Sequence, residues 1–464
     1  MFRQPIKSQS STVGWLYGIG LLLLLQQFFV TLISERFIYE VDIAHTPVFA
    51  YVLSQVAAGI VFLFLLRVIP RLTVSTGLIP LTLLIGLLLR LLLFDSQPIM
   101  EIDFYRYLWD GAVTANGYNP WLLAPESISQ AGSEELQRLA ADAGSIFERI
   151  NYAELRTIYP PLTQLVFAAA YLLDDWSLNA WRVLILLFDI ASLAIILQIL
   201  KQLERSALWS LLYWWNPLLI HESYNALHMD ILLLPCLLMA VLWLIRKHYI
   251  AATAMLTLAA GFKLWPLLLI PFCIRPLLSK PRELVMAITT MLVIGLIVIA
   301  PLFYFALGEN SGLLSYSQSW LRNSALFPFL DSVLSSMALN SRLLIALCLG
   351  GFALFLNRQP LENADEILAA ICWLVATLFL LSPTQFPWYT IWFAPLLCFY
   401  PQPALLLLVA LMPIYYLRFY FVAVGNTEFF DNFVIWFQYL PVYGLLLLAY
   451  IRRHSFPLVT SSHV

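Results

Sequence analysis

Uncharged apolar runs of about 20 residues recur along this sequence, and each has the length of a transmembrane helix. Apolar residues make up 61% of the 464 residues and charged residues 11%, whereas about a quarter of an ordinary globular chain is charged. Such a chain has too little polar surface to cover a water-soluble particle. The sequence therefore predicts an all-α polytopic integral membrane protein, and it excludes a secreted or cytosolic enzyme and a nucleic-acid-binding domain.

The apolar runs predict about 12 to 14 crossings. Residues 158–173 are expected to lie in the outer leaflet, and 249–273 is expected to form two short helices that meet at a polar tip, because Gly261 and Pro266 interrupt it. The predicted spans are about 13–33, 48–68, 75–94, 179–200, 206–222, 229–245, 249–273, 284–305, 341–356, 366–381, 388–400, 403–421 and 432–451.

The distribution of Lys and Arg predicts the orientation, since positively charged loops are retained on the cytoplasmic side. Basic loops, beginning with Arg3 and Lys7, alternate with acidic or neutral ones, of which residues 95–157 are the longest. Both termini are therefore expected to be cytoplasmic. The long acidic loop is expected to face outward and to contain interfacial helices.

That outer loop opens with a carboxylate pair, Glu101 and Asp103, followed by Arg106, Tyr107 and Asp110. Asp103, Arg106, Tyr107 and Asp110 have the spacing i, i+3, i+4, i+7, so on a helix these four side chains share one face. A solvated interfacial helix whose charges pair locally would show the same pattern. Because ionisable groups are costly in a membrane, those kept there are candidates for function. The carboxylate pair is therefore a candidate for acid/base or metal chemistry at the membrane surface.

Other polar groups lie at the outer ends of later spans. Lys263 occupies the hairpin tip, where it is expected to bind an anion, with a snorkelling membrane anchor as the alternative. Arg90 and Arg418 lie inside spans, each about one helical turn from the outer end. Two alternatives stand for the polar residues at 221–230: Asn225 or Asp230 caps a helix, or His221, His228 and Asp230 form a metal site.

The outer side thus holds acids that can deprotonate a hydroxyl, cations that can hold a phosphate, and Trp and Tyr rings that can stack on a sugar. These groups suit a transfer from a lipid phosphate to an extracytoplasmic hydroxyl. No Walker-type or Rossmann-type glycine motif occurs in the sequence, so a nucleotide-driven reaction is not expected. A transporter or lipid flippase is the alternative, although no internal repeat supports it. An O-antigen ligase or polymerase with a lipid pyrophosphate donor is another.

A series of short motifs resembles one known family. In their order and over about 90–390, they are similar to polyprenyl-phosphate-sugar-dependent glycosyltransferases of the GT-C fold, and nearest to bacterial mannosyltransferase-like relatives of the GPI mannosyltransferase I catalytic subunit. The motifs are Asp103–Gly111 with Asn119-Pro120, Ile158–Leu162, Asn216–Leu218 through Asn225–Asp230, Lys263–Pro266, and Leu381–Thr384 with Pro387–Tyr389.

The resemblance implies an inverting transfer of a hexose, with mannose favoured, from a polyprenyl-phosphate donor. It makes Asp103 the catalytic base with Glu101 beside it. Ile102 and Phe386 depart from the relatives, which often carry an acid and a His there. Donor phosphate binding is expected from Lys263, Arg106, Arg90 and Arg418, and substrate contacts from Tyr105, Tyr107, Asp110, Tyr159, Asn225, His228, Asp230, Trp320, Gln385, Trp388 and Tyr389.

The implied organisation has three parts. Residues 1–74 form N-terminal transmembrane helices that extend the core, 75–400 form a GT-C-like catalytic core with its outer loop at 95–178, and 401–464 form C-terminal helices and a cytoplasmic tail. The expected location is a bacterial inner membrane, with the site facing the periplasm or outside. No cofactor is certain and a divalent metal stays open. The glycan, lipid or protein that accepts the sugar and the oligomeric state also stay open.

Overall fold

Helices make up all the regular secondary structure of the computed structural model, which describes residues 7–73, 77–358 and 361–455. No strand occurs in these ranges, where two isolated bridges join Arg156 to Ser311 and Arg322 to Thr384. The prediction of an all-α polytopic membrane protein is confirmed. Arg3, residue 74 and the tail 456–464 lie outside the described residues.

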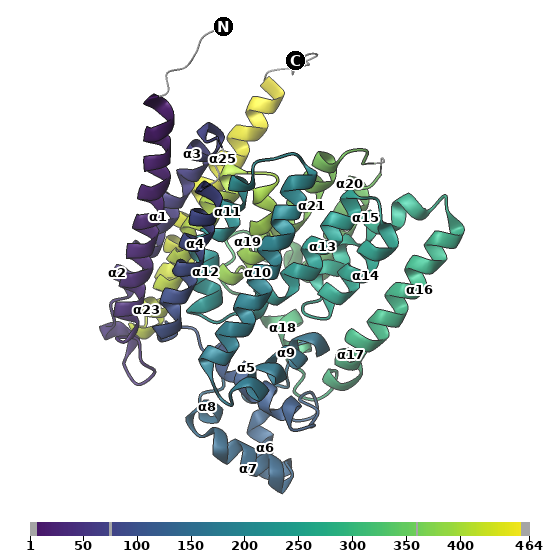
Figure 1. Ribbon diagram of the computed structural model, residues 1–464. Helices are drawn as coiled ribbons and strands as arrows, with labels where there is room; N and C mark the ends of the chain where they lie inside the picture. Colours follow the sequence, from purple (N-terminus) through teal and green to yellow (C-terminus); the bar gives the residue numbers. More distant parts are fainter. Residues whose placement is uncertain (1–6, 74–76, 359–360, 456–464) are drawn as a thin grey trace.

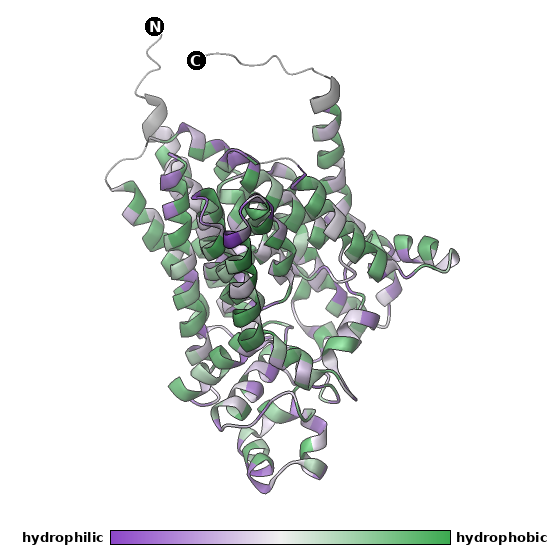
Figure 2. Cartoon of the chain, turned by 90° about the vertical axis from the view of Figure 1, so that its right-hand side faces the viewer, coloured by the Kyte–Doolittle hydropathy of each residue, from purple (hydrophilic) through white to green (hydrophobic). Residues whose placement is uncertain are grey.

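Long apolar helices form the body of the molecule. Figure 2 shows that hydrophobic residues dominate this bundle, with hydrophilic residues more frequent towards the ends. Its longer helices are α1 (Lys7–Ser34), α2 (Val48–Leu63), α4 (Leu78–Leu91), α10 (Leu178–Gln202), α13 (Leu234–Ile245), α14 (Tyr249–Ala260), α16 (Pro281–Val298), α19 (Phe327–Ser336), α20 (Ser341–Leu356), α21 (Ala364–Leu381) and α25 (Trp436–Ser455).

Short helices and turns extend or connect these spans. The α-helical ones are α3 (Leu65–Val68), α11 (Leu211–Trp214), α12 (Pro217–Tyr224), α15 (Ile270–Ile274), α17 (Ala300–Ala306), α18 (Gly312–Ser319), α22 (Pro403–Leu411), α23 (Leu417–Ala423) and α24 (Thr427–Phe429). The 3-10 turns here are η1 (Ile43–His45), η2 (Ile69–Arg71), η3 (Leu92–Asp95), η5 (Ala207–Ser210), η6 (Met229–Leu233), η7 (Trp265–Leu269), η8 (Arg275–Leu277), η9 (Pro387–Trp392), η10 (Ala394–Cys398) and η11 (Met412–Tyr416), and η12 (Phe430–Val434) is a π-helical turn.

Eight helical stretches of the described chain are long and apolar enough to cross a membrane, or up to ten if each of two bent pairs is one span. The predicted count of about 12 to 14 is therefore too high. The excess arises where proline breaks the helical hydrogen bonding, as in the pieces that begin at Pro217 and Pro387. The first bent pair, Pro217–Tyr224 with Met229–Ile245, turns by 106° and places its break at the functional cavity described below.

The long acidic loop predicted to face outward forms a helical cap at one end of the bundle. Figure 1 shows α5 to α8 at the end opposite the start of α1 and the end of α25. The cap comprises α5 (Asp103–Ala115), η4 (Pro125–Ser127), α6 (Ile128–Ala131), α7 (Glu134–Ala143), α8 (Ser145–Glu148) and α9 (Pro161–Leu173). Helix α9, with 13 residues, is too short for a full crossing, as expected for 158–173, and its location in the outer leaflet stays a prediction.

Helix α5 carries the first predicted motif and packs against α9 at very short range. A Cβ atom on Gly111 would lie 2.4 Å from the Phe167 carbonyl oxygen, so only glycine permits this approach. The helix ends before Gly117, which has φ +80 in the left-handed region that glycine adopts freely. The close packing holds the first turn of α5, and with it Asp103, at the inner side of the cap.

Candidate active site

A cavity of about 690 Å³ lies between the helical cap and the bundle. It is bounded by the start of α5, the segment 151–160, η6, the hairpin tip at 262–265, η9 and the α18 and α23 regions. Of the residues predicted for the site, the cavity is lined by Glu101, Asp103, Arg106, Tyr107, Tyr159, Asp230, Lys263, Trp320, Trp388, Tyr389 and Arg418.

Asp103 is the first residue of α5, and its side chain remains 27% exposed at the cavity wall. Its Oδ1 atom accepts a hydrogen bond of 2.7 Å from Asn151 Nδ2. Burial raises the pKa of Asp103, and this rise is opposed by the Asn151 hydrogen bond and by the positive charges of Lys263 and Arg106. The cations and the amide therefore favour the ionised form of this carboxylate.

Glu101, two residues earlier, has a different environment. It is only 7% exposed, and within the described chain its Oε1 atom has no hydrogen-bond partner. Burial and the neighbouring negative charges of Asp103 and Glu222 raise the pKa of Glu101 well above its ordinary value. When the environments of two neighbouring carboxyl groups give them different pKa values, one group can act as an acid and the other as a base. Burial thus raises the pKa of Glu101 with no opposing cation, whereas Lys263, Arg106 and Asn151 oppose the rise at Asp103.

Lys263 faces this carboxylate pair from the hairpin tip. Its Nζ atom donates to Asp230 Oδ1 at 2.6 Å and lies 4.1 Å from the centre of the Tyr389 ring and 4.9 Å from that of Trp392. The same Asp230 oxygen accepts from Trp392 Nε1 at 2.6 Å. Burial lowers the pKa of Lys263, but the Asp230 carboxylate opposes that shift. The ammonium is thus held in a box of one carboxylate and two aromatic faces.

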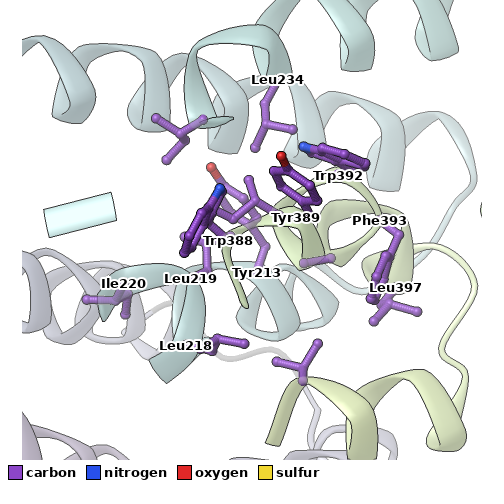
Figure 3. Close-up of a cluster of buried hydrophobic side chains, with 14 of the residues drawn as sticks. Tyr213, Leu218, Leu219, Ile220, Leu234, Trp388, Tyr389, Trp392, Phe393 and Leu397 are labelled. Atoms are coloured by element: carbon purple, nitrogen blue, oxygen red, sulfur yellow. The ribbon is translucent and has the colours of Figure 1, made fainter. Parts of the chain in front are cut away.

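Aromatic rings from η9 form one wall of the cavity. Tyr389 and Trp392 stack with ring centres 4.2 Å apart, and Figure 3 shows them in the buried cluster beside α12. Tyr316 hydroxyl lies 2.7 Å from Tyr389 hydroxyl and ties α18 to this wall. Flat aromatic surfaces next to fixed polar groups provide the two types of contact that a sugar ring uses.

Two of the predicted cations line the cavity but already have partners. Arg106 donates through Nη2 to the carbonyl oxygens of Tyr152 and Leu155, at 2.9 and 2.8 Å. Arg418 donates from Nε to Asp431 Oδ1 at 3.1 Å. Arg106 therefore holds the segment that carries Asn151, and Arg418 brings an already paired charge to the cavity.

Residues with left-handed backbone conformation flank the key polar groups. Met100 has φ 63 immediately before Glu101, and Tyr152 has φ 50 immediately after Asn151. Leu227, with φ 65, directly precedes His228. Non-glycine residues in this region cost about 1 to 3 kcal/mol each and cluster at functional sites, where the surrounding structure enforces them. The tertiary structure therefore maintains the orientation of these polar groups at the expense of backbone strain.

The prediction that Arg90 binds a donor phosphate is wrong. Its side chain is fully buried in the bundle, where Nε donates to Asp189 Oδ2 at 2.5 Å and Nη1 donates to the carbonyl oxygens of Gly86 and Trp214. The Asp189 carboxylate also accepts from Tyr213 and Tyr224. A guanidinium with these partners fastens α4 to α10 and has no access to the cavity.

Four predicted substrate contacts also lie behind the cavity wall. Asn225 bonds the backbone of Ile99 and Gln97, and it thereby positions the segment that leads to Glu101. The other three are Asp110, which accepts from Gln164, Tyr105, which accepts from Arg149, and Gln385, which donates to Ser324 and to backbone carbonyls. Each has protein hydrogen-bond partners and is absent from the cavity lining, so none of the four contacts substrate in this cavity.

His228 is likewise absent from the cavity lining and fully buried. The alternative of a metal site with His221 and Asp230 is not supported, because those two residues are engaged elsewhere. His221 lies 2.5 Å from the Tyr51 hydroxyl, and Asp230 holds Lys263. The described residues contain no cluster of three or more His, Cys, Asp or Glu residues that could hold a metal ion.

Three residues that shape the site, Trp392, Asn151 and Tyr316, are not among those predicted from the sequence. Trp392 follows Tyr389 by three positions, so the spacing on a helical turn could have indicated a shared face. Asn151 and Tyr316 have no local motif, since each is brought to the cavity from a loop or a short helix distant in sequence.

A cavity between an apolar helical bundle and its cap, with a carboxylate, a boxed ammonium and an aromatic wall, has the components of a glycosyltransferase site. The chain belongs to the alpha-(1->6)-mannopyranosyltransferase family, since residues 31–279, more than half of its length, match the family's N-terminal domain. It is thus a glycosyltransferase acting on mannose, which decides against the transporter and flippase alternative. No curated protein and no solved structure matched the chain.

Proposed function

We propose that this protein is an inverting mannosyltransferase that uses a polyprenyl-phosphate-linked donor and an extracytoplasmic acceptor hydroxyl, on a GT-C-like fold in a bacterial inner membrane. The observation that carries the proposal is the pairing, across one cavity, of Asp103 with the boxed ammonium of Lys263. An inverting displacement needs a base on the acceptor side and a positive charge on the leaving-group side.

In the proposed reaction Asp103 takes the proton of the acceptor hydroxyl while that oxygen forms a bond to the anomeric carbon. The bond from this carbon to the lipid phosphate breaks, and the phosphate leaves with the electron pair. A positioned base contributes about 10² to 10⁴ to such a rate. Lys263 stabilises the negative charge that develops on the phosphate, with Arg106 and Arg418 as more distant cations.

The apolar arm of the cavity suits the lipid part of the donor. Ile43, Phe419, Val422 and Ala423 line it on the side of η1 and α23. Asp103, Arg106 and Asn151 come from the cap, and the basic-loop pattern of the sequence supports a position of the cap outside the cytoplasm. A lipid-linked sugar would then lie with its tail towards the bilayer and its sugar against the aromatic wall.

The test is transfer by purified protein in lipid, with polyprenyl-phosphate mannose as donor. Asp103→Asn keeps the shape and removes the base, so we expect the rate to fall by about 10² to 10⁴. Glu101→Gln is the matched control, because a neutral Glu101 is mimicked by the amide, and we expect a loss of less than about tenfold. Transfer by Asp103→Asn at the original rate would refute the assignment, and a preference for a pyrophosphate-linked donor would refute the proposed donor class.

A further inference from the structure

His228 is a fully buried imidazole that lies between two carboxylates. Its Nδ1 atom is 3.9 Å from Asp103 Oδ2, and its Nε2 atom is 3.9 Å from Glu222 Oε2. Neither distance is a hydrogen bond, and no other residue of the described chain bonds either nitrogen. Unpaired buried polar atoms are unfavourable and rare. Two unpaired nitrogens in the His228 ring, beside the proposed base Asp103, therefore require a functional explanation.

An aromatic stack determines how this ring can move. His228 lies flat on Trp388, with ring centres 3.6 Å apart and planes inclined by 15°, and Phe386 stacks on Trp388 with centres 4.3 Å apart. Such a stack resists tilting of the imidazole but allows it to slide within its plane. A slide of roughly 1 Å would bring Nδ1 to hydrogen-bond distance from Asp103.

Asp103 has one oxygen already held and one that faces this ring. Oδ1 accepts from Asn151, whereas Oδ2 is the oxygen opposite His228 Nδ1. Catalytic hydrogen bonds are often long in the absence of substrate and shorten when it binds. We propose that His228 is a positioning residue for the base: its Nδ1–H holds Asp103 Oδ2 in the substrate complex. This inference rests on the proposed role of Asp103.

The surrounding charges agree with a neutral imidazole in that role. Tyr416 hydroxyl lies 2.9 Å from both oxygens of Glu222, and Oε2 is also the oxygen nearest to His228 Nε2. A neutral ring that donates through Nδ1 keeps Nε2 as an acceptor, on the side that faces Glu222. The other charged and titratable groups near Asp103 and His228 are Glu101, Arg106, Tyr107, Tyr159, His221, Asp230, Lys263 and Tyr415.

Three substitutions of His228 test the proposal through kcat and the pH dependence of kcat/KM in the lipid-reconstituted protein. His228→Asn places an amide near the position of Nδ1, and His228→Gln places one near that of Nε2. His228→Phe keeps the ring stacked on Trp388 and removes both nitrogens. We expect Phe and Gln to lower kcat by about 10² to 10³, as removal of one preorganised donor does, and Asn to stay within about tenfold of the native protein.

The acid limb of the pH profile gives a readout that a packing role would not change. A donor to a carboxylate lowers its pKa, so loss of the donor raises the pKa of Asp103, and the acid limb moves about one unit to higher pH in the Phe and Gln variants. His221→Phe, another fully buried imidazole, is the control: its melting temperature falls and its acid limb stays in place.

Equal losses in all three variants with an unmoved acid limb would overturn the proposal, as would native kcat in His228→Phe. If His228→Phe does not fold, the contrast between Asn and Gln decides. A failure of the proposed function is separable, because it appears as full activity of Asp103→Asn, whereas failure of this inference leaves Asp103→Asn inactive.

Discussion

Lys263 Nζ and Asp230 Oδ1 lie 2.6 Å apart, at the point where the hairpin tip meets the break between α12 and α13. The Asp230 side chain is 2% exposed and that of Lys263 is 25% exposed, so the pair presents its positive member to the cavity. A charged group that is held by a buried partner needs little reorganisation when a second anion arrives. This arrangement is the form of electrostatic preorganisation that stabilises developing charge.

Replacement of Lys263 is expected to affect the donor more than the acceptor. Lys263→Met keeps most of the stem and removes the charge, so kcat/KM for the polyprenyl-phosphate donor should fall by about 10² or more, with a smaller change for the acceptor. Steady-state kinetics with each substrate varied in turn measure the difference. Equal losses for the two substrates would contradict a phosphate role.

Asp230→Asn tests whether the carboxylate acts only through the lysine. Because Asn still accepts from Trp392 but no longer neutralises Lys263, we expect a change in donor binding that disappears when Lys263 is already Met. A double-mutant cycle on donor KM measures this coupling. Additive effects of the two substitutions would show that Asp230 contacts substrate independently.

The pH profile of the native enzyme is expected to report Asp103. Burial raises the pKa of this carboxyl, and only the ionised form is a base, so kcat/KM should fall as the pH drops through a value above about 3.9, the ordinary pKa of Asp. Asn151→Ala removes a hydrogen bond that lowers the pKa, and the acid limb should move to still higher pH. A shift to lower pH would contradict the assignment of Asp103.

Arg90 is expected to matter for stability and not for chemistry. Arg90→Leu leaves the Asp189 carboxylate buried without its cation, at a cost of about 3 to 5 kcal/mol, while the protein that remains folded keeps its turnover. The control is Arg138→Ala, which breaks the ion pair with Glu134, whose two side chains are 77% and 82% exposed. The stabilities of the two variants are compared by thermal unfolding in lipid. The control should change stability by less than about 1 kcal/mol. Native stability of Arg90→Leu would disprove the structural role.

Gly111 is expected to be intolerant of alanine. The added Cβ would overlap the Phe167 carbonyl, so α5 and α9 must separate at a cost of about 1 to 3 kcal/mol, and Asp103 would shift with α5. Gly14→Ala in α1 is the matched control, because nothing lies within 4 Å of its Cβ position. It should be neutral or slightly stabilising. Unchanged melting temperature and turnover in Gly111→Ala would contradict the described packing.

Much of the helical pattern could be predicted because it depends on local properties. Apolar runs and Asn-Pro or Gly breaks act over a few residues, so α10 (Leu178–Gln202), α20 and α21 lie within two residues of their predicted bounds. The span count was overpredicted because short apolar pieces such as 388–400 have the composition of a span without its length. The cavity lining was predictable where a motif opens a helix, as at Asp103.

The sequence by itself determined the all-α membrane fold, the long acidic loop and the candidates Asp103 and Lys263, because hydropathy and the cost of charge in a membrane depend on residue type alone. Only the tertiary structure decided what each candidate touches. It placed Arg90 on Asp189, brought Asn151 to Asp103 and left His228 between two carboxylates. The physical reason is that these partners come from segments distant along the chain. Two charged residues of the same type therefore have different roles when packing gives them different partners.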